Sequence, residues 1–500
     1  MITLSITGMT CASCANHIQD ALIAIRGVSN ARVSYEQASA TVAIKKETET
    51  NAEVKEQVLI DAIEALGYSA KVVAPDCCNN TGVAKDKNTD ELHVAIIGSG
   101  SAAFACAIKS AERGARVTLL AAADVIGGCC VNVGCVPSKI LIRAAQLAEQ
   151  QRSNPFEGLE NHIPILDRAQ LARQQTARVE ELRAAKYQHI LDTNPKLSLV
   201  RGFASFKDAH SLVVRHDDGF EQVLSADRFL IATGSQPAIP PIEGLAGTPY
   251  WTSTEALFAT ELPEHLIVIG SSVVALELAQ AYRRLGSAVT VLARSTLLSR
   301  DEPLLGETLA SVFEDEGIRV LSHCQIQHVA YQGGFYVLDT NQGQVYGDRL
   351  LVATGRAANT AALNLAAAGA AVDASGAVQV DDFMATSQPH IYAAGDCSTM
   401  PQFVYVAAAA GSRAGINMTG GEARLELSTM PAVIFTDPLV ATVGLAERQA
   451  REHGMETDSR VLLLENVPRA LANFDTRGFI KLVAEAGTHR LIGAQVLAHD

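Results

Sequence analysis

Two stretches of this sequence each join a short apolar strand to a run of glycine and other small residues. The first is His93–Ile97, followed by Gly98-Ser-Gly100-Ser-Ala-Ala103 and a helix expected at residues 102–113. The second covers residues 266–269 and continues as Gly270-Ser-Ser272-Val-Val-Ala275. Small side chains there let the backbone approach a pyrophosphate, whose negative charge the helix N-terminus stabilises. The sequence therefore predicts two dinucleotide-binding βαβ units within α/β domains.

The bulk properties of the chain exclude several classes of protein. Its 500 residues, 48% apolar and 19% charged, indicate a globular chain of several domains. A net charge of −14 argues against binding to nucleic acid or to an anionic membrane surface. No run approaches the ~20 apolar residues of a membrane-spanning helix, and the first residues lack the pattern of a signal peptide. We therefore expect a cytoplasmic protein without membrane insertion.

The ten cysteines are too few for a disulfide scaffold in a chain of this length, and several of them cluster. Such clusters indicate reactive or metal-binding thiols in a reducing compartment. The clusters are Cys11 with Cys14, Cys77 with Cys78, and Cys129 with Cys130 and Cys135.

Residues 1–72 are predicted to form a separate ferredoxin-like βαββαβ domain. Its first strand and first helix flank the run Gly8-Met-Thr-Cys11-Ala-Ser-Cys14. Two thiolates at a helix N-terminus suit a soft metal cation. The motif resembles the heavy-metal-associated domains of metallochaperones and metal pumps, although a thioredoxin-type redox pair and half a zinc site are alternatives. The expected strands are residues 2–7, 28–33, 40–44 and 68–72, and the expected helices are 15–25 and 54–66.

Residues 73–91 are polar, lack periodicity and are predicted to be a flexible linker. The linker contains Cys77-Cys78. These two thiols either relay metal between the small domain and the rest of the chain or are incidental.

The run Gly127-Gly128-Cys129-Cys130-Val-Asn-Val-Gly-Cys135-Val-Pro137-Ser-Lys139 follows the first βαβ unit. We expect a glycine-framed turn that leads into a helix, with Pro137 in its first turn. A thiol at a helix N-terminus has a lowered pKa and is nucleophilic near neutral pH. The run resembles the redox-active disulfide of the flavoprotein disulfide reductases, and in particular their Hg(II)-reducing branch. Without the flanking motifs, a structural disulfide or two buried thiols would also fit.

This resemblance implies two Rossmann-like domains that bind FAD and NADPH, together with an α+β interface domain. The expected FAD-binding domain comprises residues 92–234 and 356–428, and the NADPH-binding domain comprises residues 235–355. Residues 429–500 match the start of an interface domain that makes a homodimer, and its C-terminal end is expected to be missing. In the family, that missing end carries a cysteine pair that the partner subunit contributes.

The resemblance also implies a set of cofactor-binding residues. One family feature is absent, because Ala121-Ala-Ala precedes Asp124 where an acidic residue would bind the adenosine ribose. Either Asp124 replaces that acid or ribose binding is weaker. The expected FAD contacts are Gly98, Gly100, Ala103, Gly128, Cys129, Lys139, Ala204, Gly395, Asp396 and Val404.

The second nucleotide unit indicates a preference between coenzymes. After the strand Ala288–Leu292 the chain offers Ala293-Arg294 rather than an acidic residue. A guanidinium there favours a 2′-phosphate, and so NADPH over NADH. Arg300 is a second candidate, and the alternative for both is a solvated surface charge. The expected NADPH contacts are Gly270, Ser272, Ala275, Arg294 and Arg300.

The resemblance assigns roles to the reacting residues. Cys135 would lie against the flavin and Cys130 would be the outer, exchanging thiol. Lys139 would lie beside the flavin with Glu277 as its ion-pair partner, unless the two form an ordinary structural pair. Tyr250, in the run Pro249-Tyr-Trp-Thr-Ser-Thr, would give the bound ion an oxygen contact, unless it is a plain buried tyrosine.

We therefore expect an NADPH- and FAD-dependent enzyme that reduces Hg(II), held by Cys130 and Cys135, to Hg(0). The N-terminal Cys11 and Cys14 would capture the metal. A reductase of glutathione-like or dihydrolipoamide-like disulfides is one alternative, and a metal-sequestering protein is another. Cys129 replaces the threonine usual in relatives, and a third thiol there would bind metal, form a wrong disulfide or weaken the flavin contact.

Overall fold

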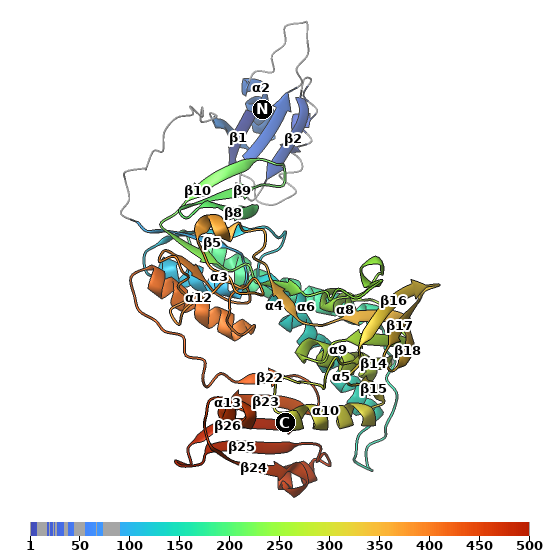
Figure 1. The fold of residues 1–500 in the computed structure, drawn as a ribbon. Helices are drawn as coiled ribbons and strands as arrows, with labels where there is room; N and C mark the ends of the chain where they lie inside the picture. The colour runs from blue at the N-terminus through green and yellow to red at the C-terminus, as the bar shows by residue number, and fades with distance from the viewer. Residues whose placement is uncertain are drawn as a thin grey trace. The chain divides into compact units, whose positions relative to one another are not determined.

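The structure is a computed structural model of the chain. It describes residues 2–7, 18–19, 21–23, 25, 28–34, 39–44, 56–66, 68–73 and 91–499. The chain divides into two units, Met1–Thr89 and Asp90–Asp500, which are treated separately below (Figure 1).

The first unit has a four-stranded antiparallel sheet in the order β2-β3-β1-β4. Residues 18–19 and 21–23 are helical, and α2 (Glu56–Glu64) crosses between the last two strands in sequence. This order and these connections confirm the predicted ferredoxin-like fold. Apolar side chains of the strands and helices, among them Leu4, Ile18, Val42 and Leu59, form its core. The strands are β1 (Ile2–Thr7), β2 (Val28–Ser34), β3 (Ser39–Ile44) and β4 (Ser69–Val73).

The second unit begins with a five-stranded parallel sheet in the order β21-β11-β5-β6-β7. Helices α3 (Ser101–Glu112) and α12 (Val404–Met418) cover one face, and an antiparallel three-stranded sheet covers the other. Gly411 lets the two helices touch, because a Cβ there would lie 2.1 Å from the Ala102 carbonyl oxygen. The parallel strands are β5 (His93–Ile97), β6 (Arg116–Ala121), β7 (Leu197–Arg201), β11 (Arg228–Ile231) and β21 (Ile391–Ala393); the covering sheet is β8 (Phe203–Asp208), β9 (Ser211–Arg215) and β10 (Glu221–Ser225).

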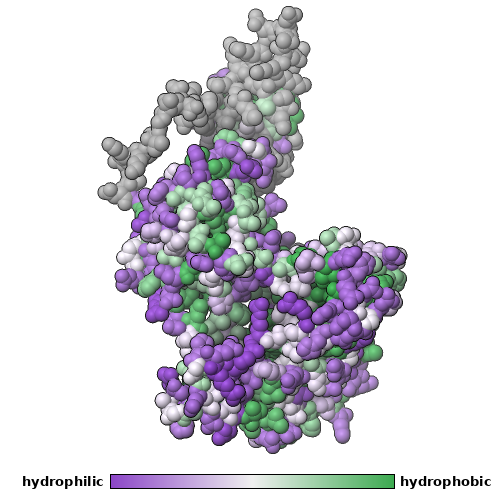
Figure 2. All heavy atoms as spheres, in the orientation of Figure 1, coloured by the Kyte–Doolittle hydropathy of each residue, from purple (hydrophilic) through white to green (hydrophobic). Residues whose placement is uncertain are grey.

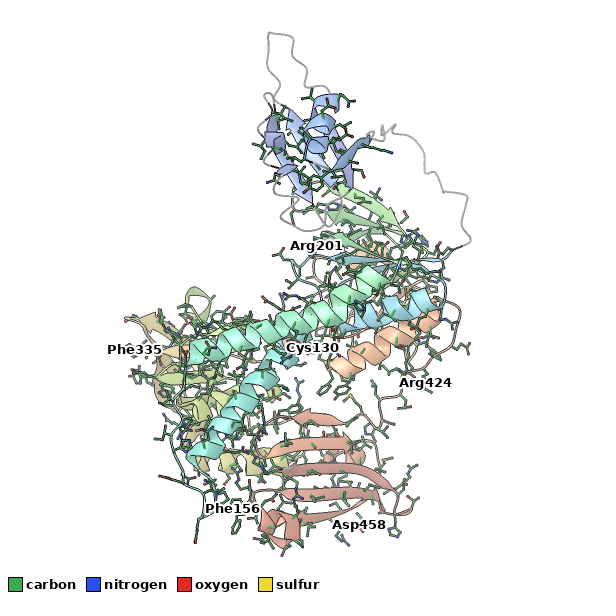
Figure 3. All side chains as sticks on the ribbon, turned by 180° about the vertical axis from the view of Figure 1, so that it is seen from behind. Cys130, Phe156, Arg201, Phe335, Arg424 and Asp458 are labelled. Carbon is green, nitrogen blue, oxygen red and sulfur yellow. The ribbon has the colours of Figure 1, made fainter. Side chains whose placement is uncertain are left out.

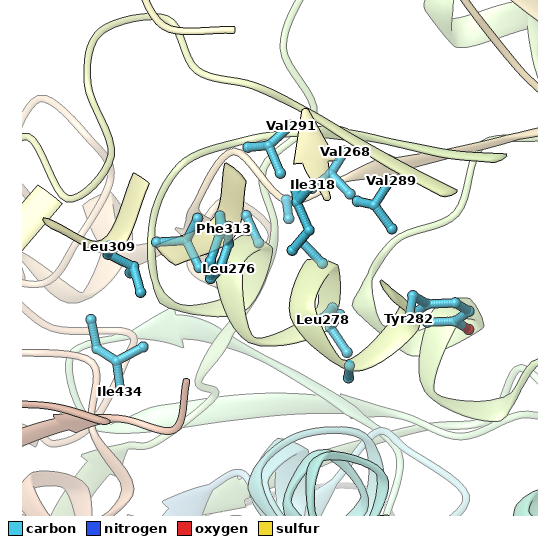
Figure 4. Packing of buried hydrophobic residues seen from close by; sticks show 14 of the residues in the cluster. Val268, Leu276, Leu278, Tyr282, Val289, Val291, Leu309, Phe313, Ile318 and Ile434 are labelled. Atoms are coloured by element: carbon cyan, nitrogen blue, oxygen red, sulfur yellow. The ribbon is translucent and has the colours of Figure 1, made fainter. Parts of the chain in front are cut away.

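A second parallel sheet, ordered β15-β14-β13-β19, follows the same plan. Helices α9 (Val273–Leu285) and α10 (Pro303–Asp315) pack on one face, where Leu276, Phe313 and Val291 share a core (Figure 4). The strands are β13 (His265–Ile269), β14 (Ala288–Leu292), β15 (Ile318–Leu321) and β19 (Arg349–Val352); the opposite face carries β16 (Ile326–Gln332), β17 (Phe335–Thr340) and β18 (Gly343–Gly347). The two sheets confirm the predicted pair of Rossmann-like folds.

Two short strands link these domains. The chain leaves the first sheet at β12 (Ser235–Pro237) and returns at β20 (Arg356–Ala358), and these strands pair as an antiparallel ribbon. Both crossings between the nucleotide-binding domains therefore lie side by side.

The C-terminal part confirms the predicted α+β interface domain. Its five-stranded antiparallel sheet has the order β22-β23-β26-β25-β24. The strands are β22 (Ala432–Ile434), β23 (Leu439–Gly444), β24 (Thr457–Leu463), β25 (Phe479–Glu485) and β26 (Leu491–Ala498), with helices α13 (Glu447–Glu452) and α14 (Pro468–Ala472).

The helices after the first βαβ unit differ from the expectation in one respect. The predicted turn around the cysteines is a short helix, α4 (Gly128–Val133), and a second helix, α5 (Cys135–Arg152), begins directly after Gly134. Pro137 lies in the first turn of α5, as expected. A long helical stretch follows as α6 (Arg168–Arg183), a π-helical turn (Ala184–Gln188) and α7 (His189–Thr193). Among the described helices, none is long and apolar enough to cross a membrane.

The two parallel sheets share a polar arrangement at the start of their first strands. The Nε2 atom of His93 lies 2.9 Å from Thr118 Oγ1, and His265 Nε2 lies 2.8 Å from Thr290 Oγ1. The backbone N–H groups of both histidines donate to aspartates, Asp227 and Asp348. Burial is the main cause that lowers the pKa of each imidazole below its usual value of 6.5.

This arrangement predicts acid sensitivity of the fold. The unfolded histidines take up protons as the pH falls below 6.5, while the folded ones stay neutral, so acid favours the unfolded chain. We expect the urea midpoint to fall between pH 7 and pH 5, and to fall less when His93→Gln and His265→Gln are combined. An equal fall in the double variant would show that other groups cause the acid sensitivity.

Candidate functional site

Cys130 and Cys135 lie on consecutive helices, with Gly134 between them. Cys130 is in α4, near the meeting of α5 and α6 (Figure 3), and Cys135 is the first residue of α5. A Cβ on Gly134 would lie 2.9 Å from the Cys129 carbonyl oxygen, so this close junction requires glycine. The first turn of α5 has no side-chain cap and no acidic residue. Its free N–H groups and helix dipole therefore face Cys135, where they stabilise a thiolate.

Cys130 and Cys135 are not joined by a disulfide in this structure, and their side chains share a hydrogen bond. A hydrogen bond from Cys130 is the main cause that lowers the pKa of Cys135, and Lys139 lowers it further against the effect of burial, to about 7. The same hydrogen bond, followed by burial, raises the pKa of Cys130. At neutral pH the reduced pair thus holds a substantial fraction of Cys135 thiolate beside a protonated Cys130.

Lys139, whose charge helps to lower the pKa of Cys135, belongs to an ion pair. Lys139 Nζ donates to Glu277 Oε2 at 2.7 Å, which joins α5 to α9. The other carboxylate oxygen of Glu277 accepts the backbone N–H of Phe435 at 2.9 Å. The Phe435 ring also lies 4.4 Å from Lys139 Nζ, a cation–π distance. Phe435 belongs to the interface domain and had no role in the sequence analysis, since no sequence signal links it to Lys139.

The interface domain also bonds to the next turn of α9, and these bonds hold Phe435 against Lys139 and Glu277. Gln280 accepts the backbone N–H of Asp437 and donates to its carbonyl oxygen, both at 2.8 Å. Arg284, which is buried, pairs with Glu316 at 2.6 Å and with Asp437 at 2.8 Å. These paired charges fix the segment that carries Phe435 against α9, and a 200 Å³ cavity remains beside it.

The predicted first dinucleotide site has the close backbone contacts that such a cofactor needs. A Cβ on Gly98 would lie 2.2 Å from the Ala232 carbonyl oxygen, and one on Gly128 would lie 2.6 Å from Gly100 Cα. Gly100 is the N-cap of α3, whose first turn has no acidic residue. A side chain at Gly98 or Gly128 would collide with neighbouring backbone, so these glycines let the loops around the N-terminus of α3 pack closely into a cradle that fits a bound dinucleotide.

The other expected flavin contacts lie around the same sheet. Gly395 adopts φ +83° after β21, and a Cβ there would lie 3.2 Å from Ala407 Cβ of α12. Val404 is the first residue of α12, which has neither a side-chain cap nor an acidic first turn. Ala103 is buried in α3, and Ala204 is buried in β8. Two uncapped helix N-termini thus flank the predicted flavin site.

Arg356 joins two of the predicted flavin contacts and was missed by the sequence analysis. Its guanidinium donates to Ser235 Oγ at 2.7 Å and to Cys129 Sγ at 3.4 Å, and lies 3.8 Å from Asp396 Oδ2. Ser235 in turn donates to Asp396 Oδ2 at 2.8 Å. The available signal was its position directly after Ala353-Thr-Gly355, at the second crossing between the domains.

The Cys129 thiol therefore lies beside an arginine and accepts a hydrogen bond from it. Burial raises the pKa of its thiol, while Arg356 opposes that rise. Within the described residues, the only three potential ligand atoms within 4.8 Å of one another belong to Asp437, Asp475 and His499. Cys129, Cys130 and Cys135 do not form such a group of three in this structure, and metal binding by Cys129 stays a hypothesis. Asp437 and Asp475 are already paired with arginines.

The second predicted dinucleotide site repeats the geometry of the first. A Cβ on Gly270 would lie 2.2 Å from the Ala353 carbonyl oxygen. Ser272 is the N-cap of α9, the helix that carries Glu277, and Ala275 is buried in its first turn. Two arginines considered for the 2′-phosphate, Arg294 and Arg300, are exposed beyond the end of β14.

Tyr250 and Asp124 are two further residues that the sequence analysis named. Tyr250 is partly buried against Ile267 and Ile269, on the face of the second sheet opposite α9, so its contact with the ion stays a prediction. Asp124 is exposed, and Arg201, labelled in Figure 3, donates to its carbonyl oxygen at 2.6 Å, so the role of Asp124 at the ribose stays a prediction. Cys11, Cys14, Cys77 and Cys78 lie outside the described residues.

Comparison with known proteins gives three matching families. The pyridine nucleotide-disulphide oxidoreductase family matches residues 92–411, its dimerisation domain matches residues 430–500, and the heavy-metal-associated domain matches residues 3–69. Among solved structures, the Cu(II) complex of the HOCl-induced flavoprotein disulfide reductase RclA from Escherichia coli has a TM-score of 0.72 at 30% identity. That alignment covers 82% of this chain and 90% of the other.

Curated relatives extend the match over the full chain. The mercuric reductase of Shewanella putrefaciens is 65% identical over 100% of this chain and 90% of its own length. Those of Acidithiobacillus ferrooxidans and Shigella flexneri are 57% and 54% identical over 99% and 100% of this chain, and 89% and 90% of their own lengths. The chain therefore belongs to the pyridine nucleotide-disulphide oxidoreductase family, within its mercuric reductase branch, and carries a heavy-metal-associated domain at its N-terminus.

Proposed function

We propose that this enzyme reduces Hg(II) to Hg(0) at Cys130 and Cys135, with electrons that NADPH supplies through FAD. The observation that carries the proposal is the thiolate of Cys135, stabilised by Cys130 and Lys139 beside a dinucleotide cradle. The mercuric reductase relatives, which match the whole chain, support Hg(II) as the substrate.

The residues of the pair suit a soft metal ion. Thiolates are preferred ligands of soft cations, so Hg(II) would bind Cys135 first and then Cys130, which releases its proton to solvent. Two electrons convert the ion into uncharged Hg(0), which the two sulfurs no longer hold electrostatically; both sulfurs are left as thiolates, and Cys130 takes up a proton from solvent to restore the starting pair. Bound flavin supplies the transfer of that electron pair from the nicotinamide.

The remaining residues position these groups. Glu277 holds the Lys139 ammonium beside the pair, and Phe435 restrains it from the interface domain. Gly98, Gly100, Gly128, Asp396 and the N-terminus of α12 would hold FAD, and Ser235 links Asp396 to Arg356. The exposed Arg294 would recognise the 2′-phosphate of NADPH, and Arg300 is a second candidate.

The proposal extends to the domains at both ends of the chain. Cys11 and Cys14 would capture Hg(II) and pass it to the catalytic pair, at an effective concentration that the linker keeps high. The dimerisation domain at residues 430–500 would join two copies of the chain. The few, clustered cysteines suit a reducing compartment rather than a disulfide scaffold, which supports a cytoplasmic location.

A disulfide reductase is the second candidate function. The likeness to the flavoprotein disulfide reductase RclA favours it, because the same cysteine pair can exchange with a disulfide.

The first prediction concerns the substrate. With excess small thiol present, we expect NADPH oxidation to depend on Hg(II), and Cys130→Ser or Cys135→Ser to lower that rate by about three orders of magnitude. Replacing the buried Cys324 by alanine is the control and should leave the rate nearly unchanged. Turnover of glutathione disulfide without any response to Hg(II) would favour the disulfide reductase.

The second prediction concerns the thiolate. In the reduced enzyme, the alkylation rate of Cys135 should rise with pH around a midpoint of about 7. Lys139→Met should move this midpoint upward because a cation is lost, and Cys130→Ala should move it further because the hydrogen bond is the larger cause. Cys130→Ser, which keeps a donor, should recover part of the shift. Equal midpoints in all variants would mean that neither group stabilises the thiolate.

The third prediction concerns the coenzyme. Arg294→Ala should raise the KM for NADPH about tenfold, equivalent to ~1.4 kcal/mol, and leave the KM for NADH unchanged. Arg319→Ala removes an exposed arginine from the neighbouring strand β15 and serves as the control. If Arg294→Ala weakens both coenzymes equally, this arginine does not recognise the 2′-phosphate.

A further inference from the structure

Asn132 is a buried polar side chain within the cysteine run, between Cys130 and Cys135. Hydrophilic residues cover most of the visible face of the Asp90–Asp500 unit, and the surface is where asparagines normally lie (Figure 2). Asn132 is instead only 9% exposed. Burying an amide costs free energy unless its hydrogen-bonding groups find partners, so the contacts of this side chain carry information about its role.

The Asn132 amide bonds to three other residues. Its Nδ2 atom donates to the carbonyl oxygens of Ile126 and Gly128, each at 2.9 Å. Its Oδ1 atom accepts a hydrogen bond from Arg183 Nη1 at 3.0 Å. These contacts need two N–H donors and an acceptor on one short side chain, which an amide offers and a carboxylate or an apolar group does not.

The two carbonyl groups belong to the turn that helps to form the flavin cradle. Gly127 and Gly128 have φ values of +100° and +68°, conformations that other residues rarely adopt. The N–H of Gly127 donates to the Ser99 carbonyl oxygen at 2.7 Å, and Gly128 lies against Gly100. Because glycine has the most backbone freedom, two in succession do not hold such a shape by themselves. The bonds from Asn132 to the residues on either side of Gly127 therefore stabilise this turn.

Asn132 also belongs to α4, the helix that carries Cys130. This helix has six residues, too few to be stable without tertiary contacts. Arg183 is the last residue of α6, and its bond to Asn132 joins the short helix to a much longer one. The π-helical turn that follows Arg183 places the Tyr187 ring 3.2 Å from where a Cβ on Gly127 would lie. This long helical stretch thus holds the cysteine run at two points.

We propose that Asn132 is a positioning residue that couples the flavin cradle to the cysteine pair, with Arg183 fixing the orientation of its amide. The proposal rests on the FAD site and the cysteine pair proposed above. A movement of the turn at Gly128 would be transmitted through Asn132 to α4, and so to the hydrogen bond between Cys130 and Cys135. One amide therefore affects both the shape of the cradle and the stability of the Cys135 thiolate.

The test replaces Asn132 by leucine, which is uncharged and similar in size but makes no hydrogen bonds. Asn132→Leu should raise the dissociation constant for FAD about tenfold, measured by flavin fluorescence on dilution of the full chain, because two buried hydrogen bonds of the turn are lost. With FAD in excess, the alkylation midpoint of Cys135 should rise toward that of Cys130→Ala. Asn417→Leu is the matched control, because Asn417 also donates to two backbone carbonyl oxygens, near the C-terminal end of α12. This control should leave both quantities unchanged.

Arg183 gives a second test in which Asn132 stays in place. Arg183→Met should raise the FAD dissociation constant by less than Asn132→Leu does, because the amide keeps its carbonyl partners and loses only the group that orients it. Arg183→Lys keeps a donor and should restore part of the affinity. Circular dichroism and the thermal midpoint check the fold of each variant. If Asn132→Leu does not fold, the Arg183 variants decide the proposal, and unchanged affinity in Arg183→Met would overturn it.

The outcomes separate this proposal from the function proposed above. An unmodified chain that binds no FAD would overturn the FAD site and the coupling together. If the unmodified chain binds FAD and Asn132→Leu matches Asn417→Leu in both measurements, Asn132 has only a structural role and the proposal fails. Weaker FAD binding with an unchanged midpoint of Cys135, or the reverse, would overturn the coupling while leaving the FAD site standing.

Discussion

The carboxylate of Glu277 is the point on which the arrangement of the larger unit depends. It is 4% exposed and belongs to the second nucleotide-binding domain, yet it binds Lys139 of the first domain and the backbone of Phe435 in the interface domain. Burying a carboxylate costs free energy unless both of its oxygen atoms accept hydrogen bonds. The first domain and the interface domain each supply one partner, so both carboxylate oxygens are satisfied only when all three domains are in place. The thiolate of Cys135 then lies beside a cation whose position the whole fold determines.

The two nucleotide-binding domains are built alike, down to their polar contacts. Gly98 and Gly270 make equivalent close approaches to the carbonyl oxygens of Ala232 and Ala353. The histidine that starts the first strand of each sheet bonds a threonine in one neighbouring strand. Its backbone N–H donates to the aspartate that directly precedes the neighbouring strand on the other side. The two domains thus share one backbone geometry and differ in the residues beyond the strand ends. The cysteine-bearing helix α4 follows the first unit, and exposed arginines follow the second.

Much of the fold was predictable because its signals are local. The strands at His93–Ile97 and Ala288–Leu292 agree with the sequence prediction, since their residues are apolar and a glycine or a polar turn bounds them. The cysteine run was predicted as a turn because it contains three glycines, but contacts with α5 and α6 stabilise it as a helix. Arg356 and Phe435 were missed because each acts on residues far away in the sequence, and a single sequence carries no signal for such pairs.

The sequence by itself determined the chemistry: two cysteines five positions apart, two glycine-rich dinucleotide units and an N-terminal Cys-x-x-Cys motif. These depend on residue type and short spacing, which the chain carries directly. Only the tertiary structure decided that Cys130 lowers the pKa of Cys135, which arginine meets Cys129, and that an interface-domain backbone amide supports the Lys139–Glu277 ion pair. Those features depend on distances between separate domains, and such distances are fixed only when the packed cores bring the domains together.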